Sequence, residues 1–139
     1  MPFYGKIYKT IMQPSEEICL MYTIIEKQDN QYIELLPGME PISSEEDALQ
    51  LVSLCYENDI YLVMLSSEHL STDFFDLHTG LAGKIMLKLS MHGIKVVALV
   101  NSEQVGDGRF AEMAMEGNHF NNFGFFYAKE QAEEWLFRS

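Results

Sequence analysis

Basic residues are scarce in this chain of 139 residues. Nine Lys and Arg stand against 21 Asp and Glu, so the formal net charge at neutral pH is -12. Proteins that bind nucleic acid draw most of their affinity from Lys and Arg that neutralise phosphates, and anionic membrane surfaces attract the same cations. The composition therefore argues against both nucleic acid and membranes as partners.

Cysteine and histidine are also scarce. Cys19 lies in a predicted strand and Cys55 on the apolar face of a predicted helix, and no other cysteine occurs. Two such residues make neither a disulfide framework nor a CxxC metal site, so we expect both to be reduced and buried. The four histidines are His69, His78, His92 and His119. None shows a ligand spacing such as HxxxH, so we expect no metal and no cofactor.

Long apolar runs are absent. No stretch approaches the roughly 18 to 20 apolar residues that cross a bilayer, and the first twelve residues lack the apolar core and the cleavage site of a signal peptide. We therefore expect a cytoplasmic protein. The length and the 47% hydrophobic content suit one core, so residues 1–139 should form a single domain.

The strongest pattern in the chain runs from Phe74 to Val100. It contains an apolar helix that ends near Gly93, followed by a continuous apolar strand. The upstream run from Ile60 to Leu65 has the same character, which is typical of a strand covered on both faces. We predict that residues 60–65 and 94–100 form adjacent parallel strands, joined by a right-handed crossover through the helix after Thr79.

The helix in this segment has apolar residues on nearly every side, with Lys84 and Lys88 marking a narrow polar stripe. This pattern predicts a mostly buried helix. A glycine inside a helix costs up to about 1 kcal/mol relative to alanine. We therefore expect Gly80 and Gly83 to allow close approach to the sheet or to a partner, and we expect Gly83→Leu to destabilise the fold by overpacking.

The segments before this unit predict a hairpin and a helix. Ile18 to Glu26 and Gln31 to Leu36 have strand composition and flank a turn, so they predict an antiparallel hairpin. Ser43 and Glu46 have the spacing of a capping box, ahead of a predicted helix from about Ser44 to Glu57. Residues 1–17 allow either a helix or a strand.

The segments after the unit predict a short helix from Arg109 to Glu116, a strand from Phe123 to Tyr127, and a terminal helix from Lys129 to Phe137. Together these elements predict an α/β fold in a single domain. It has one mixed sheet of about five strands, an N-terminal antiparallel hairpin, a parallel strand-helix-strand core and about four helices.

Several residues match the pattern of a known family. The matching positions are Phe74, Phe75, Asp76, Leu77, Thr79, Gly80, Ala82 and Gly83, and farther on Arg109, Phe110, Glu116 and Asn118. With the closing run FFYAKEQAEEWL, they resemble the bacterial family known as domain of unknown function 4180. The resemblance covers about residues 20–137 and leaves residues 1–17 as an extra segment. It departs from the pattern at Lys84, where an acidic residue is expected, and in the loop 101–108.

The family has no assigned activity, so the resemblance implies a fold and no reaction. The order of the elements also resembles the SpoIIAA-like, or STAS-type, fold, in which helices pack on a mixed sheet. That likeness is an analogy of architecture, and an architecture does not fix a function.

Polar residues at two places suggest a ligand site. Ser66, Asn101 and Ser102 follow the two central strands, and ligands of open α/β sheets bind beyond the carboxyl ends of parallel strands. The site also includes Asp76, His78 and Thr79, at the predicted start of the helix. A helix start offers free N–H groups that favour an anionic or polar ligand. The alternatives are ordinary turn chemistry and helix capping. The run TGLAGK lacks the spacing of a phosphate loop.

No set of nucleophile, base and orienting group has a recognisable spacing, so the sequence identifies no catalytic residue. We expect a regulatory module that binds a small ligand or a protein. One alternative is an enzyme whose site is assembled from loops at the carboxyl ends of the central strands. Another is a structural homo-oligomer, since nine Met and nine Phe exceed the evident needs of one small core.

Overall fold

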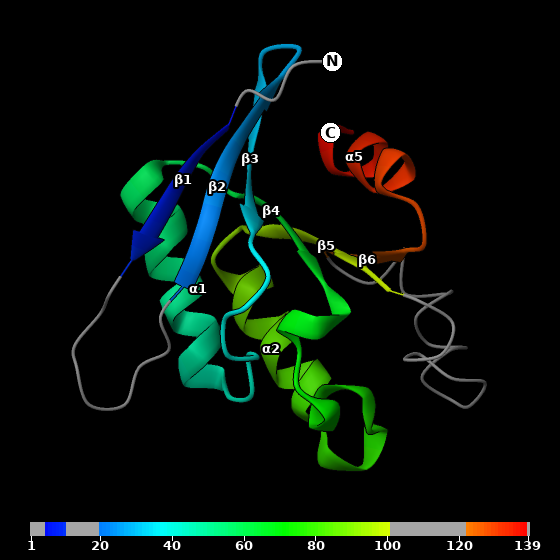
Figure 1. Ribbon diagram of the computed structural model, residues 1–139. Coiled ribbons are helices and arrows are strands. Elements are labelled where there is room, and N and C mark those ends of the chain that lie inside the picture. The colour runs from blue at the N-terminus through cyan, green and yellow to red at the C-terminus, as the bar shows by residue number, and fades with distance from the viewer. Residues whose placement is uncertain (1–4, 11–19, 101–121, 139) are drawn as a thin grey trace.

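The computed structural model describes residues 5–10, 20–100 and 122–138, which contain one mixed sheet of six strands (Figure 1). The strands are β1 (Gly5–Thr10), β2 (Leu20–Lys27), β3 (Asn30–Leu35), β4 (Leu62–Ser66), β5 (Lys95–Leu99) and β6 (Phe123–Phe126). Their order in the sheet is their order in the chain. β1, β2 and β3 pair antiparallel, and the pairs from β3 to β6 are parallel. The predicted α/β class with a mixed sheet is confirmed.

Three α-helices lie in the described residues. They are α1 (Glu45–Asn58), α2 (Leu81–Met91) and α5 (Lys129–Phe137). Short 3-10 turns η1 (Ser67–His69), η2 (Thr72–Phe75) and η3 (Leu77–Thr79) connect β4 to α2. About four helices were predicted, and the expected one at 109–116 lies outside the described residues. None of the described helices has the length and hydrophobicity that a bilayer span requires.

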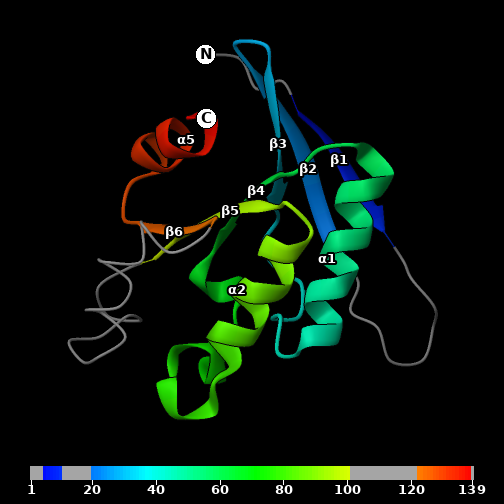
Figure 2. The same ribbon diagram turned by 180° about the vertical axis from the view of Figure 1, so that it is seen from behind.

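The helices make three layers with the sheet (Figure 2). α1 and α2 lie side by side on one face and share the larger core cluster with β2 to β6. α5 covers the other face, where Ala132 and Leu136 pack on Tyr32, Met64 and Val97. Because successive strand residues point to opposite faces, β4 sends Met64 towards α5 and its neighbours towards α1 and α2.

The predicted hairpin is β2 and β3. Gln28 and Asp29 form its turn, and both have positive φ, 53° and 66°. That backbone matches the twist of the two strands, as in a type I′ turn. The hairpin has a further partner, because β1 pairs with β2 in register from Gly5↔Ile25 to Thr10↔Leu20. This strand accounts for the sixth member of the sheet, where about five were predicted, and it comes from the segment to which the sequence assigned no single structure.

The central parallel pair is also confirmed. β4 and β5 are neighbours in register from Leu62↔Lys95 to Ser66↔Leu99, and α2 connects them. β3 pairs parallel with β4 at Ile33↔Val63, with α1 as the connection. The second strand of the hairpin is therefore part of the parallel core, which the sequence pattern did not predict.

The cap of α1 lies one residue later than predicted. Ser44, not Ser43, is the N-cap, and its Oγ accepts the N–H of Asp47 at 3.1 Å. Asp47, not Glu46, is the acidic partner of this cap, and its carboxylate accepts the N–H of Ser43, the residue before the N-cap, at 2.9 Å. Both serines are followed by an acidic residue at the third position, so spacing alone could not distinguish them.

Cys55 is a buried packing residue of α1, as expected. Burial raises the pKa of its thiol to about 12, so the group stays protonated and poorly nucleophilic at neutral pH. Cys19 lies outside the described residues.

Gly83 is not a packing residue, and the prediction of a mostly buried helix is wrong. α2 buries Ala82, Ile85, Met86 and Leu89, but Gly83 is exposed and Leu87 keeps 57% of its surface exposed. A Cβ at Gly83 would meet no atom within 4 Å. The apolar residues of α2 thus exceed the face that it buries, and Gly83→Leu has no neighbour to overpack.

Gly83→Ala should stabilise the protein by about 0.5 to 1 kcal/mol, because alanine has the higher helix propensity and reduces the freedom of the unfolded chain. Gly80→Ala is the matched control. Gly80 has φ of +72° at the N-cap of α2, so alanine there should destabilise by about 1 to 2 kcal/mol. Urea denaturation of both variants measures the difference. A loss of stability in Gly83→Ala would mean that a neighbour occupies the space beside it.

Candidate functional site

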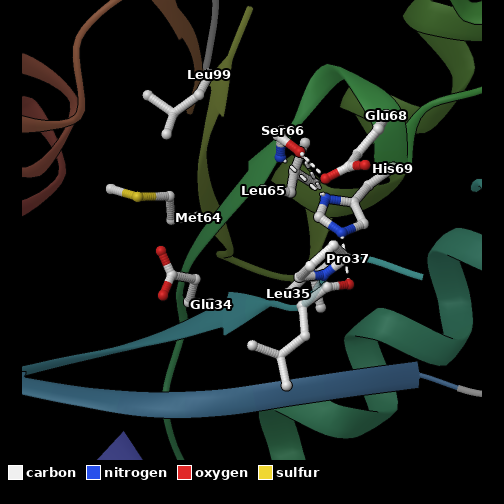
Figure 3. A pocket seen from close by; sticks show the side chains of 10 residues that line it. Glu34, Leu35, Pro37, Met64, Leu65, Ser66, Glu68, His69 and Leu99 are labelled. Atoms are coloured by element: carbon white, nitrogen blue, oxygen red, sulfur yellow. Dashed lines mark hydrogen bonds between the residues drawn. The ribbon is translucent and has the colours of Figure 1, made fainter. Parts of the chain in front are cut away.

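A pocket of about 210 Å³ opens at the carboxyl ends of β3, β4 and β5 (Figure 3). Its lining includes Glu34, Met64, Ser66, Glu68, His69 and Leu99. Ligands of open α/β sheets bind at this edge of the parallel strands. The volume lies below the roughly 300 to 1,000 Å³ of pockets for drug-sized molecules, so it suits a small metabolite.

The strand register explains the layout of the pocket. Glu34 pairs with Met64 across β3 and β4, and Ser66 pairs with Leu99 across β4 and β5. The apolar side chain of Met64 therefore lies next to Glu34, and Leu99 lies beyond Met64, with Ser66 to one side of them (Figure 3). The site has an apolar middle and polar ends.

His69 fixes the end of the pocket that contains Ser66. Its ring is 2% exposed. Nδ1 accepts the backbone N–H of Ser66 at 3.0 Å, and Nε2 lies 2.8 Å from the carbonyl oxygen of Leu36. An N–H can only donate and a carbonyl can only accept, so the ring is neutral and carries its proton on Nε2. The hydrogen bonds thereby assign the tautomer.

The same residue joins two loops. The ring binds Leu36 in the loop after β3, and the carbonyl of His69 accepts the N–H of Ile42 at 2.7 Å. The N–H of Ser71 returns to the carbonyl of Ile42 at 3.0 Å. The loops after β3 and β4 are therefore held together at the rim of the pocket.

The Ser66 hydroxyl has two acceptors close by. Its Oγ lies 3.2 Å from His69 Nδ1 and 3.2 Å from Glu68 Oε1. The lone pair of Nδ1 already accepts the Ser66 N–H, so we infer that the hydroxyl proton goes to Glu68. His69 is then not a free base for Ser66, and the pair positions the hydroxyl without activating it.

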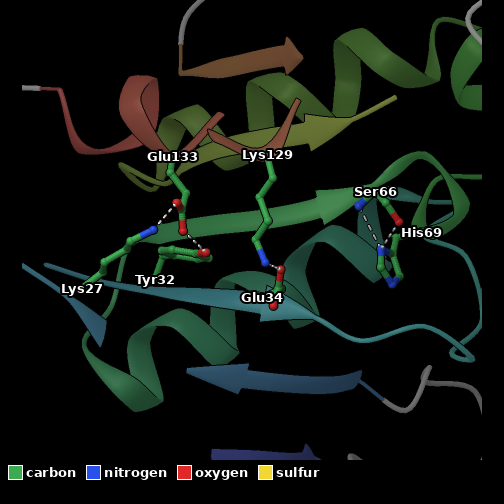
Figure 4. A network of polar contacts seen from close by, with 7 residues as sticks. All are labelled: Lys27, Tyr32, Glu34, Ser66, His69, Lys129 and Glu133. Atoms are coloured by element: carbon green, nitrogen blue, oxygen red, sulfur yellow. Dashed lines mark hydrogen bonds and ion pairs between the residues drawn. The ribbon is translucent and has the colours of Figure 1, made fainter. Parts of the chain in front are cut away.

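Glu34, at the other end of the pocket, is tied to α5. Its carboxylate pairs with Lys129 Nζ at 2.9 Å (Figure 4). Lys129 is the first residue of α5, so this helix reaches the pocket at its N-terminal end. This ion pair links α5 to one residue of the pocket lining.

Glu133 attaches the middle of α5 to the hairpin. Its carboxylate accepts the Tyr32 hydroxyl at 2.6 Å and Lys27 Nζ at 2.9 Å. Partial burial of Glu133 raises its pKa, but the hydrogen bonds from Tyr32 and Lys27 outweigh burial and leave the pKa below the ordinary range. Burial, and then the bond to Glu133, raise the pKa of Tyr32, which stays neutral as a donor.

Lys95 holds the far end of α5. Its ammonium donates to the carbonyls of Trp135 at 2.7 Å and Arg138 at 2.5 Å, and it lies 4.5 Å from the centroid of the Trp135 ring. These carbonyls belong to the helix C-terminus, where a cation is favourable. Burial and the charge of Arg138 lower the pKa of Lys95.

The structure places one of the predicted site residues, Ser66, in the pocket. Asp76, His78 and Thr79 are exposed in the turns before α2 and lie outside the pocket lining. Asp76 accepts the N–H of His78 at 3.0 Å, and Thr79 accepts the N–H of Leu81 at 3.2 Å. These bonds match the alternatives of turn and cap. Asn101 and Ser102 lie outside the described residues.

The sequence analysis missed Glu34, Glu68, His69 and Leu99. Glu34 is a polar residue in a strand of alternating polar and apolar residues. Once β3 was known to pair parallel with β4, this pattern could have predicted that Glu34 lies at the site. His69 follows Ser66 by three residues in the loop that was already suspected. Within the described residues, no three His, Cys, Asp or Glu side chains are placed to hold a metal ion.

His69→Ala should destabilise the protein by about 2 to 4 kcal/mol, because it leaves the N–H of Ser66 and the carbonyl of Leu36 without partners. The control is His78→Ala. The side chain of His78 is exposed, so its removal should change stability by less than about 0.5 kcal/mol. Chemical denaturation compares the two, and equal effects would contradict the role of His69 as a tie between loops.

Glu133 should make the stability depend on pH in the acid range. A carboxylate with a lowered folded pKa stabilises the fold above its ordinary pKa, near 4.3, and loses that contribution as the pH falls through the lower folded value. The stability advantage of wild type over Glu133→Gln should therefore shrink between about pH 5 and pH 3. Denaturation at each pH measures it. Glu134→Gln, on the exposed side of α5, is the control and should change stability little.

Comparison with known families places the chain. A family model described as Domain of unknown function (DUF4180) matches residues 27–136, well over half of the chain. A search of curated proteins and a search of solved structures each found no match. The matched segment contains every residue that lines the pocket. The chain therefore belongs to the DUF4180 family.

Proposed function

We propose that the protein binds a small polar ligand in the pocket at the carboxyl ends of β3, β4 and β5. The observation that carries this proposal is the construction of the rim. His69 is almost fully buried, and both of its ring nitrogens form hydrogen bonds that hold Ser66 and Leu36 in place. Hydrogen bonds that fix the shape of two loops in this way are typical of a preorganised binding site.

The hydrogen bonds of Ser66 and His69 favour binding over catalysis. A serine nucleophile needs a base whose lone pair faces the hydroxyl. Here Nδ1 accepts a backbone N–H at 3.0 Å, which is closer than the hydroxyl at 3.2 Å. An enzyme with a site built from these loops remains the alternative, and it requires the hydroxyl to replace the N–H at Nδ1.

A protein partner or a homo-oligomer is the other alternative. The large apolar side chains that are exposed among the described residues are Leu49, Tyr56, Leu87, Met91 and Tyr127. They lie on α1, on α2 and after β6, and they include one Met and no Phe. Among the described residues, Met and Phe therefore contribute little to an exposed apolar surface, and the pocket is the better supported site.

The regulatory role, the cytoplasmic location and the likeness to the SpoIIAA-like fold are further parts of the proposal. A regulator that senses a ligand needs a pocket connected to an outer element, and the Glu34–Lys129 pair connects this pocket to α5. The mixed sheet with helices on both faces is compatible with the fold likeness. A reduced, buried Cys55 is compatible with the cytoplasm.

A ligand screen tests the proposal by comparing wild type with a variant in which a larger side chain fills the pocket. Thermal unfolding is followed for wild type, Leu99→Trp and Leu87→Trp across a panel of small metabolites. A ligand present at 100 times its Kd adds about 2.7 kcal/mol to the free energy of unfolding. We expect compounds that stabilise wild type and Leu87→Trp, whose indole lies on the exposed side of α2, and fail to stabilise Leu99→Trp. Compounds that stabilise all three equally would place the site elsewhere.

A further inference from the structure

We propose that the ligand carries a primary ammonium group, bound between Ser66 and Glu68, and a short apolar body that lies along Met64 and Leu99. This inference rests on the proposed function and names the class of ligand for the same pocket. It is carried by the charges, the free acceptors and the apolar middle of the site.

The charges of the lining favour a cation. No lysine or arginine is among the described residues that line the pocket, whereas two glutamates are. Lys129 neutralises Glu34 at 2.9 Å. Glu68 is exposed and forms no ion pair with a described residue. The pocket thus retains one unneutralised carboxylate, in a chain whose net charge of -12 also attracts cations and repels anions.

The acceptors suit the three donors of an ammonium. The Ser66 hydroxyl directs its one proton to Glu68 and accepts the backbone N–H of His69 with one lone pair, so its other lone pair remains for a ligand donor. Ser66 Oγ and Glu68 Oε1 are 3.2 Å apart, so one nitrogen can reach both oxygens at hydrogen-bond distance. The His69–Ser66 N–H bond fixes this serine, so the acceptors are in place before the ligand arrives. Bonds from an ammonium to a carboxylate are of the stronger, charge-assisted kind.

The apolar lining residues determine the chemistry of the part of the ligand that follows the ammonium group. Met64 and Leu99 supply the apolar lining beside the Ser66–Glu68 end, and Met64 lies next to Glu34 (Figure 3). Lys129 already pairs with Glu34, which makes Glu34 the less favourable of the two carboxylates for a second cation. A volume of about 210 Å³ limits the apolar body to a short chain.

This ligand differs from the anionic one expected at the start of α2. The Leu81 N–H at that helix end is not free to donate to an anion, because it already donates to Thr79 Oγ1. In the pocket, the carboxylate of Glu68, which pairs with no cation among the described residues, would repel an anion.

The test compares three probes with the same carbon skeleton. The full chain is titrated with n-butylamine hydrochloride, n-butanol and sodium butyrate at equal ionic strength, and backbone amide shifts are followed by NMR. We expect n-butylamine to move the amides of Ser66, Glu68 and His69 and to bind about tenfold more tightly than n-butanol. Sodium butyrate should bind more weakly than either.

Two variants separate the charge from the shape of the pocket. Glu68→Gln keeps an acceptor for Ser66 and should reduce the affinity for n-butylamine to that for n-butanol. Glu46→Gln removes an exposed carboxylate of α1, on the other side of the sheet, and should leave the affinity unchanged. Ser66→Ala, which keeps the backbone N–H to His69, should weaken n-butylamine by a smaller factor.

The outcomes judge the two proposals separately. If n-butanol or butyrate moves the same amides and binds with equal or higher affinity than n-butylamine, the proposal of an ammonium ligand is wrong. The proposal that the pocket binds a ligand is then still supported. If no probe moves these amides, or if Glu68→Gln binds n-butylamine as wild type does, this inference is overturned. The Leu99→Trp screen then decides on its own whether the pocket binds any ligand.

Discussion

The parallel pairing of β3, β4 and β5 is the constraint on which the rest of this structure depends. Each parallel pair needs a crossover, and α1 and α2 supply the two crossovers on the same face. Among the described residues, the opposite face is covered by α5, a helix of nine residues. The pocket lies on this face, near the N-terminal end of α5. The site is thus a consequence of how the sheet is covered.

Polar contacts help to fix where α5 lies. Ala132 and Leu136 are its buried residues, and Trp135 and Phe137 pack partly buried beside them. Glu133, Lys95 and the Lys129–Glu34 pair attach its middle and both its ends. Each contact is directional, so together they define one position among the many that a short apolar stripe would allow. Hydrophobic burial holds α5 on the sheet, and these polar contacts determine its position along the sheet.

Much of the fold could be predicted from the sequence, since its signals are local. The periodicity of α5 gave its bounds, and the apolar runs at 60–65 and 94–100 gave the central pair. The failures were of two kinds. The apolar pattern of α2 could not show that Leu87 and Gly83 face outwards. The site residues Glu34 and His69 come together only through the β3–β4 pairing, which joins distant segments and leaves no local trace.

The order of the strands has a consequence for how the chain folds. Strand order in the sheet equals order along the chain, so each new strand adds to the edge formed by the one before it. The β2–β3 hairpin closes over a two-residue turn, whereas each parallel pair closes a loop of about thirty residues, which is entropically harder and slower. During synthesis the sheet can therefore grow from the N-terminal hairpin towards β6. The described lining of the pocket is then complete once β5 has added Leu99, and the ion pair from Lys129 to Glu34 forms later.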